Sequence, residues 1–245
     1  LAPDGRIWVL TRIAHVNESF NPKRPILEDF VTVLSPGGDE IASVSILDAF
    51  QRSHFASLLE FSDPSGDIFH TNSLEVFDGR FAERSSALSA GNVLLSLNHL
   101  NAVVVMDFDR VEIVWALTGY SNHQHDAELT PEGNLLFLDN RGHAGYSKVV
   151  ELDAVSQDLV WAYFGDEQNG FVTEASGAQQ RLPNGNTLII ESNAGRAFEV
   201  DRSGQIAWEF FNPHRAGEGG ELIATLFDVQ RIPPEFPTDW LQASP

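Results

Sequence analysis

The chain has 245 residues, with 35 acidic and 15 basic side chains, a formal net charge of −20 and no Cys. Its 42% hydrophobic content includes 17 Phe and 5 Trp, which excludes a disordered chain. The absence of Cys excludes a disulfide scaffold, a Cys metal site and a thiol nucleophile. The acidic excess argues against binding to nucleic acid or to an anionic membrane surface, because both require a basic patch. No apolar run approaches the roughly 20 residues of a transmembrane helix, so we expect a soluble protein with no transmembrane segment.

The first predicted elements form an incomplete β unit. Residues 4–10, 30–34 and 40–46 have the apolar pattern of strands, separated by turn residues such as Gly and Pro. Residues 46–61 place apolar side chains at helical spacing, which predicts a short helical insertion. Residues 78–90 lengthen the turn that follows the next predicted strand.

Three further units repeat one pattern of strands. Each has a short first strand, a Gly-Asn turn before the second strand, a third strand that ends in Asp and a fourth strand that carries a Trp. The Gly-Asn pairs are Gly91-Asn92, Gly133-Asn134 and Gly185-Asn186, and the Trp residues are Trp115, Trp161 and Trp208. Four short strands per unit at this regular spacing are typical of β-propeller blades. A β-sandwich of short strands is the alternative, but it requires no such period.

We therefore predict an all-β fold in which residues 1–245 form a single β-propeller domain of four-stranded antiparallel blades. Four blades are recognisable, and a larger ring of up to six blades stays open. The N-terminal unit lacks a first strand. Residues 230–233 (Gln-Arg-Ile-Pro) echo residues 180–183 (Gln-Arg-Leu-Pro). We thus predict that a C-terminal strand near residues 224–233 completes the N-terminal blade and hides both edges.

Polar residues collect where the predicted first strands begin and the second strands end. In a propeller, these positions lie on one face, around the central channel. Histidine is frequent among them, and its imidazole can act near neutral pH as base, acid or nucleophile. We predict a His-rich, cationic channel mouth suited to an anionic substrate, formed by His70, Asn72, His99, His123, His125, Asp126, Asn140 and Arg141.

Several segments resemble the bacterial arylsulfotransferase family, whose members do not use the nucleotide sulfate donor PAPS. The resemblance covers about residues 65–235 and is carried by residues 67–75, 91–96, 101–107, 113–119, 123–126, 133–134, 139–142 and 178–191. It implies a six-bladed propeller and the transfer of a sulfuryl group from an aryl sulfate to a phenol through a sulfohistidine.

The same resemblance implies roles for individual residues. His70 and His125 match channel histidines of the family, and Arg141 matches its sulfate-holding arginine. The candidates for substrate binding are then Asn72, His99, His123, Asp126 and Asn140. No cofactor or metal is implied, the partners are a small aryl sulfate and a phenol, and the location is periplasmic or secreted.

One segment departs from the family pattern. The nucleophilic His of the family lies at the start of a later blade, and the equivalent residues 176–178 (Ser-Gly-Ala) contain no His. Either His70 or His125 then serves as the nucleophile, or the transfer activity is absent.

Two other functions stay open at the level of sequence. A non-catalytic propeller that serves as a binding or assembly module, with a protein partner or as a homo-oligomer, is consistent with the missing His. A metal-dependent hydrolase or lyase would use His123 and His125, two residues apart on an extended segment, together with His70 and Asp126.

Overall fold

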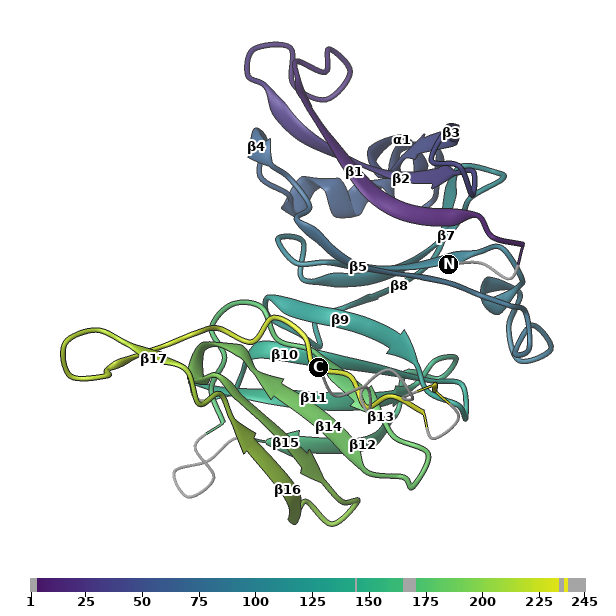
Figure 1. Ribbon diagram of the computed structural model, residues 1–245. Coiled ribbons are helices and arrows are strands. Elements are labelled where there is room, and N and C mark those ends of the chain that lie inside the picture. The colour runs from purple at the N-terminus through teal and green to yellow at the C-terminus, as the bar shows by residue number, and fades with distance from the viewer. Residues whose placement is uncertain (1–3, 144, 165–170, 234–235, 238–245) are drawn as a thin grey trace.

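A computed structural model describes residues 4–143, 145–164, 171–233 and 236–237. The chain forms four main β-sheets that follow one another in an open arc, from the N-terminal sheet at the top of Figure 1 to the fourth sheet at the bottom. This arrangement confirms the predicted all-β fold of four-stranded antiparallel units. Among the described residues, no helix combines the length and the apolarity needed to cross a bilayer.

The first sheet is incomplete, as predicted. It comprises β1 (Ile7–His15), β2 (Ile26–Leu34) and β3 (Glu40–Ser45), and the short β4 (Gly66–Asp67) pairs in parallel with the start of β2. Within the described chain, β1 pairs only with β2, so its other edge carries no strand.

The helical insertion predicted over residues 46–61 is confirmed. It consists of α1 (Ile46–Arg52) and the 3-10 helix η1 (Ala56–Phe61). Ser45 caps α1, because its hydroxyl accepts a hydrogen bond from the Asp48 amide at 3.1 Å. The apolar side of α1 is fully buried through Ile46, Leu47 and Phe50.

The other three sheets each contain four antiparallel strands in chain order. The second sheet comprises β5 (Thr71–Val76), β6 (Val93–Leu97), β7 (Ala102–Asp107) and β8 (Glu112–Thr118). The third comprises β9 (Gln124–Leu129), β10 (Asn134–His143), β11 (Tyr146–Asp153) and β12 (Leu159–Phe164). The fourth comprises β13 (Gln179–Arg181), β14 (Thr187–Glu191), β15 (Arg196–Val200) and β16 (Ile206–Phe211). Short accessory elements are η2 (Ser86–Leu88), η3 (Ser192–Ala194), β17 (Arg215–Ala216) and β18 (Leu222–Ile223).

The repeated Gly-Asn pairs mark equivalent turns. Gly91, Gly133 and Gly185 have φ values of +85°, +80° and +88°, directly before the second strand of each sheet. Glycine adopts this left-handed conformation without the steric cost that a side chain would add. Gly5, at +83°, occupies the same place before β1, which identifies β1 as a second strand.

Hydrophobic layers fill the spaces between neighbouring sheets. The layer between the first two sheets contains Phe50 of α1 and Phe69, whose rings stack with centroids 5.5 Å apart. Further layers join the second sheet to the third and the third to the fourth, where Phe137 and Phe198 are fully buried. Burial of each such ring contributes about 2–3 kcal/mol to folding, so the layers hold the inner strands in fixed positions.

Residues 224–233 differ from the prediction. They form no strand and lie against the fourth sheet instead of the first: Leu226 and Val229 pack on its apolar face. The Arg231 N–H donates to Gln180 Oε1 at 2.9 Å, just as the Arg181 N–H donates to Glu128 Oε1 at 3.4 Å. The similarity between residues 230–233 and 180–183 thus correctly indicates an equivalent backbone contact, but this contact is made to the fourth sheet and not to the first. In the described chain, no strand pairing links the first sheet to the fourth. Residues 224–233 instead lie on the fourth sheet, which directly precedes them in the chain.

The blade number of a closed ring stays a prediction.

Candidate functional site

Three residues with unusual backbone geometry precede the first strands of the second, third and fourth sheets, which are β5, β9 and β13. His70, His123 and Ser176 have φ values of +49°, +58° and +60°. They are 53 residues apart from one to the next, so they occupy the same position in three successive sheets. Left-handed geometry costs free energy for residues other than Gly and is concentrated at functional sites. Four other non-glycine residues of the described chain also have positive φ values, so what distinguishes these three turns is their recurrence at one position in successive sheets.

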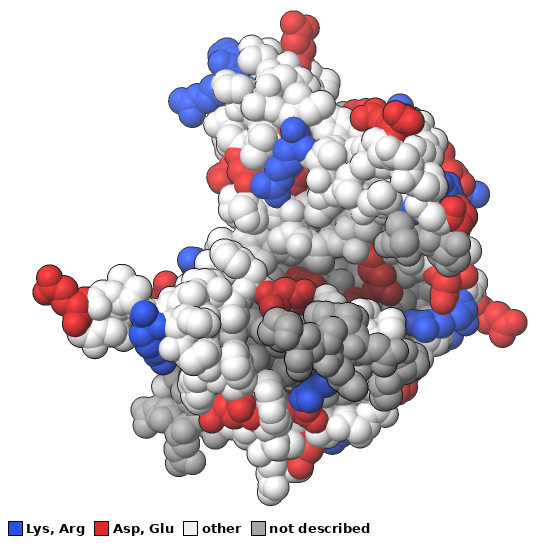
Figure 2. All heavy atoms as spheres, in the orientation of Figure 1, with Lys and Arg blue, Asp and Glu red and all other residues white. Residues whose placement is uncertain are grey.

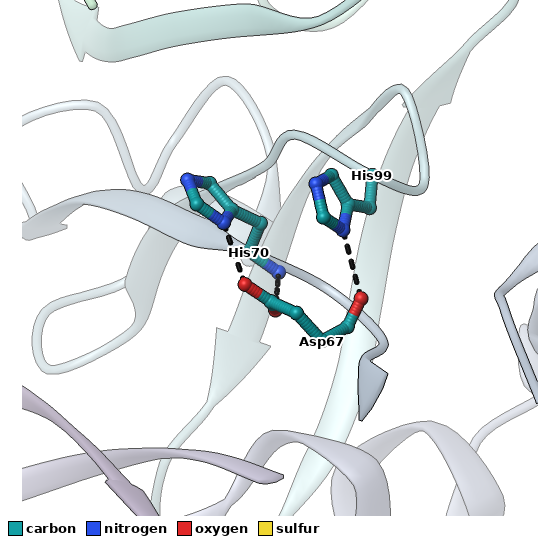
Figure 3. Close-up of side chains that lie close together, drawn as sticks. All are labelled: Asp67, His70 and His99. Carbon is teal, nitrogen blue, oxygen red and sulfur yellow. Dashed lines mark hydrogen bonds and ion pairs between the residues drawn. The ribbon is translucent and has the colours of Figure 1, made fainter. Parts of the chain in front are cut away.

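Asp67 holds two of the predicted histidines. His70 Nδ1 lies 2.6 Å from a carboxylate oxygen of Asp67, and His99 Nδ1 lies 2.8 Å from its backbone carbonyl oxygen (Figure 3). The His70 amide also donates to the Asp67 carboxylate at 2.8 Å. The two imidazole rings stack with centroids 4.8 Å apart.

Asparagine side chains hold the other two histidines. Asn98 Oδ1 lies 2.9 Å from His123 Nδ1, and Asn140 Oδ1 lies 2.7 Å from His125 Nδ1. Asn98 donates its amide to the carbonyl of Gln124, whereas Asn140 donates to the carbonyls of two residues of the loop before β13. These donations fix both amides with the oxygen towards the ring.

All four rings therefore contact an oxygen acceptor through Nδ1. An acceptor at Nδ1 requires the proton to be on that nitrogen, so the neutral imidazole carries its lone pair on Nε2. Histidine acts as a nucleophile through the unprotonated nitrogen of its neutral ring. The arrangement presents four such nitrogens, from His70, His99, His123 and His125.

Burial keeps two of the rings neutral. It lowers the pKa of His125, although the hydrogen bond to Asn140 opposes this effect. It also lowers the pKa of His123, with further contributions from the charge of Arg141 and from the neighbouring histidines. Arg141 is exposed and forms no ion pair within the described chain. Within the described chain, the predicted cationic mouth thus contains an unpaired guanidinium beside His123 and His125, whose pKa values are lowered.

His125 lines a cavity of about 230 Å³. Asn72, Asp126 and the loop at Ser176 form its other walls, together with Phe227 and Asp228 from the C-terminal segment. Burial raises the pKa of Asp126 to about 6, and burial with the nearby Asp126 charge raises the pKa of Glu128 to about 8. Figure 2 shows a recess between the N-terminal and C-terminal halves with acidic side chains inside it.

His99 borders a second hollow, of about 490 Å³. Its walls include Leu58 and Phe61 from the helical insertion, and Asn101 and Thr118 from the second sheet. None of its lining residues is a carboxylate, so this hollow differs in electrostatic character from the cavity at His125.

The structure brings most of the predicted site residues together. His70, His99 and His123 form a continuous group of rings, and His125 joins it through the backbone carbonyl of His123, 3.2 Å from its Nδ1. Asn140 holds His125, whereas Asn72 and Asp126 line the cavity beside it. The metal-ligand set considered from sequence is not brought together as a group in the described chain, where the close His and carboxylate donors are instead Asp67, His70 and His99.

Sequence reasoning missed four residues of this site. Asp67 and Asn98 hold the rings, and Phe227 and Asp228 line the cavity. Asp67 lies three residues before His70, a spacing that could have indicated a contact within one turn. Nothing in the sequence places residues 227 and 228 beside His125.

Comparison with known proteins identifies the family. Residues 1–213 match the arylsulfotransferase (ASST) family, so the chain belongs to that family. No curated protein matches the chain.

Several solved structures are similar to the chain at low identity. The Dos1 propeller is 12% identical, with 84% of this chain and 45% of that chain covered and a TM-score of 0.49. The WD40 β-propeller domain of Doa1 is 13% identical, with coverages of 76% and 50% and a TM-score of 0.46. Virginiamycin B lyase from Staphylococcus aureus is 11% identical, with coverages of 84% and 61% and a TM-score of 0.45. The chain therefore spans 45–61% of the length of these proteins.

Proposed function

We propose that this member of the arylsulfotransferase family transfers a sulfuryl group from an aryl sulfate to a phenol, with His125 as the nucleophile. The observation that carries the proposal is the state of His125. Its pKa is lowered, its Nδ1 is held by Asn140 at 2.7 Å, and it lines a cavity large enough for a small aromatic molecule.

The first half of the reaction forms a bond between His125 Nε2 and sulfur. The lone pair of Nε2 attacks the sulfur of the aryl sulfate in line with the bond to the phenolic oxygen. That S–O bond breaks, and the electron pair leaves with the phenolate. In the second half, the oxygen of an acceptor phenol, which gives its proton to solvent or a nearby base, attacks the sulfur and releases His125.

Nearby side chains supply charge and contact. Arg141 carries a permanent positive charge close enough to lower the pKa of His123, and we assign to it the stabilisation of the sulfate oxygens and the leaving phenolate. His70 and His123 provide further nitrogens at the same mouth. Phe227, 72% exposed beside the cavity, offers an aromatic face for the aryl ring of donor or acceptor.

The carboxylates of the cavity oppose an anionic donor unless they are protonated. Asp126, with its pKa of about 6, is half-protonated near that pH and carries no full charge in slightly acidic solution. We therefore assign the reaction to slightly acidic conditions. An extracytoplasmic location, inferred from family resemblance, forms part of the same proposal.

A non-catalytic binding module is the second candidate. The specific observation in its favour is Ser176, which stands where the two preceding sheets have His70 and His123. A site that retains its geometry but lacks this side chain would bind an aromatic anion without transferring its sulfuryl group. Binding without turnover would identify this function.

The test is an assay with a nitrophenyl sulfate as donor and a phenol as acceptor. We expect turnover in the unmodified protein and a loss of about 1,000-fold or more in kcat with His125→Ala, because the nucleophile is removed. His70→Ala should reduce the rate less. His214→Ala, at an exposed position outside the group of rings, is the matched control and should leave the rate unchanged. Equal rates in the unmodified protein and His125→Ala would refute the assignment.

A further inference from the structure

We propose that Asp67, His70 and His99 bind a divalent transition-metal ion such as Zn²⁺. Each side chain offers one donor atom, and the three donor atoms lie within 4.8 Å of one another. No other group of three His, Asp or Glu donors comes this close in the described part of the chain. His99 borders the hollow of about 490 Å³, and none of the three residues lines the cavity at His125, so the site does not depend on the transfer reaction.

The local fold gathers these residues before any ion binds. Asp67 ends β4, His70 lies three residues later at the strained turn before β5, and His99 follows β6. Figure 3 shows that Nδ1 of each ring faces Asp67, so an ion would bind on the side of the rings that faces this residue. The rings are stacked at an interplanar angle of 24°, so both must rotate about their side-chain bonds before their Nδ1 lone pairs converge on one ion.

The local charges favour a cation at this position. Arg12 is the only basic side chain other than His70 that pairs with Asp67 in the described chain, at 3.5 Å. The same guanidinium contacts the buried Asp29 more closely, at 2.8 Å. One arginine therefore faces two carboxylates, and the weaker of its two contacts is the one to Asp67.

The donor set selects the class of ion. Two imidazoles and one carboxylate suit Zn²⁺ and related first-row metals, whereas Mg²⁺ and Ca²⁺ prefer oxygen donors alone. The side chains of Asp67 and His70 are 23% and 42% exposed, so water can reach the remaining coordination positions. On binding, the single proton of each imidazole moves through solvent from Nδ1 to Nε2, and the lone pair left on Nδ1 binds the ion. The carbonyl and carboxylate of Asp67 hold the rings in place beforehand.

The experiment measures metal binding in the absence of any sulfate ester. The full chain is freed of metal with a chelator and titrated with Zn²⁺ by calorimetry and with Co²⁺ by visible absorption. We expect one ion per chain. Asp67→Asn and His99→Ala should each weaken binding by about 100-fold or more, since loss of outer-shell contacts alone costs 10–100-fold. The matched control is His214→Ala, which should bind as the unmodified protein does.

Two outcomes would overturn the proposal: no binding by the unmodified chain, or unchanged affinity in both Asp67→Asn and His99→Ala. If circular dichroism shows that a variant does not fold, X-ray absorption of the Zn²⁺-loaded unmodified protein is the deciding measurement. We expect two imidazole ligands on the ion, and a spectrum without imidazole ligands would contradict the site. Failure here leaves the sulfuryl transfer assay untouched, so the two proposals fail separately.

Discussion

At the scale of single residues, the site depends on how four imidazole rings are held. Each ring contacts an oxygen through Nδ1, from Asp67, Asn98 or Asn140. This common feature leaves the Nε2 lone pair free and fixes the direction of each ring. The lowered pKa values of His123 and His125 reduce the repulsion that imidazolium ions this close together would produce.

The pH dependence of transfer follows from His125 and Asp126. His125 attacks only in its neutral form. Because its pKa is lowered from 6.5, the rate should begin to fall only when the pH drops below 6.5. Asp126 ionises with a pKa of about 6 and adds negative charge beside the donor, so the rate should fall as pH rises above 6. Asp126→Asn should remove this alkaline decrease while the acid limb stays, because Asn can still accept the hydrogen bond from the Gln179 amide. A log kcat/KM profile against pH measures both limbs, and an alkaline decrease that survives in Asp126→Asn contradicts the assignment.

Glu128 should make the protein less stable as pH rises. Its pKa increases from the ordinary value of 4.5 to about 8 in the folded chain, so the folded state retains a proton that the unfolded state releases. The contribution of Glu128 to the free energy of unfolding is fully present below pH 4.5 and is lost as the pH rises through about 8. Glu128→Gln should stabilise the protein by about 2 kcal/mol at pH 8 and have little effect at pH 4. Urea unfolding at the two pH values tests this; a variant equally destabilised at both would show that Glu128 contributes favourable contacts instead.

The sequence supports part of this residue-level account. The positions of His70, His99, His123 and His125 at the ends of strands follow from the repeat alone. Their holding partners do not, because a hydrogen bond to Asn98 or Asn140 depends on side-chain rotamers. Asn98 belongs to a different sheet from His123, and the amide of Asn140 is oriented by the loop before β13. The same reason hides Phe227, which reaches the cavity only through the path of the C-terminal segment.

At the scale of elements, one contact repeats between neighbouring sheets. Arg181 lies over the ring of Trp161 at 4.9 Å and pairs with Glu151 at 2.6 Å. Arg231 lies over Trp208 at the same distance and pairs with Glu199 at 2.9 Å. Two of the three repeated Trp residues, Trp161 and Trp208, thus serve as platforms for an arginine from the segment that follows, whereas Trp115 packs in the apolar layer between the second and third sheets.

These equivalent arginines should differ in their effect on stability. The side chains of Arg181 and Glu151 are 4% and 2% exposed, whereas that of Arg231 is 46% exposed. Arg181→Ala should cost about 3 kcal/mol because it leaves a buried carboxylate with Arg202 alone, and Arg231→Ala should cost under about 1 kcal/mol. Thermal and urea unfolding of the matched pair measure the difference. Equal losses would mean that the C-terminal segment is as firmly held as β13.

Strand prediction from sequence succeeded where the repeat was clear. The expected strands correspond to β5 to β16, since the Gly-Asn turns fix their starts and the alternating apolar pattern fixes their faces. Prediction failed at residues 224–233, where a true repeat of the Gln-Arg pair was assigned to the wrong neighbour. Sequence similarity between units indicates equivalent contacts, but it does not say which sheet provides them.

At the scale of the whole molecule, the four sheets form an open arc with the histidines on one face. The inner strands of the second and third sheets lie side by side, which brings the turns at His70 and His123 together (Figure 1). Because the turns at His70 and His123 occupy equivalent positions in neighbouring sheets, their imidazole rings lie close together with His99 between them. The net charge is −20, and on the face that Figure 2 shows, acidic side chains lie on the outer surface and within the recess.

The most direct test of the central claim is to trap the sulfated enzyme. The protein is mixed with a nitrophenyl sulfate in the absence of a phenol acceptor, quenched in alkali to preserve an acid-labile N–S bond, and digested for mass spectrometry. The account predicts one added SO₃ group on the peptide that contains His125, absent in His125→Ala and discharged when a phenol is added before the quench. An unmodified His125 peptide alongside measurable transfer, or the SO₃ group on another residue, would contradict it.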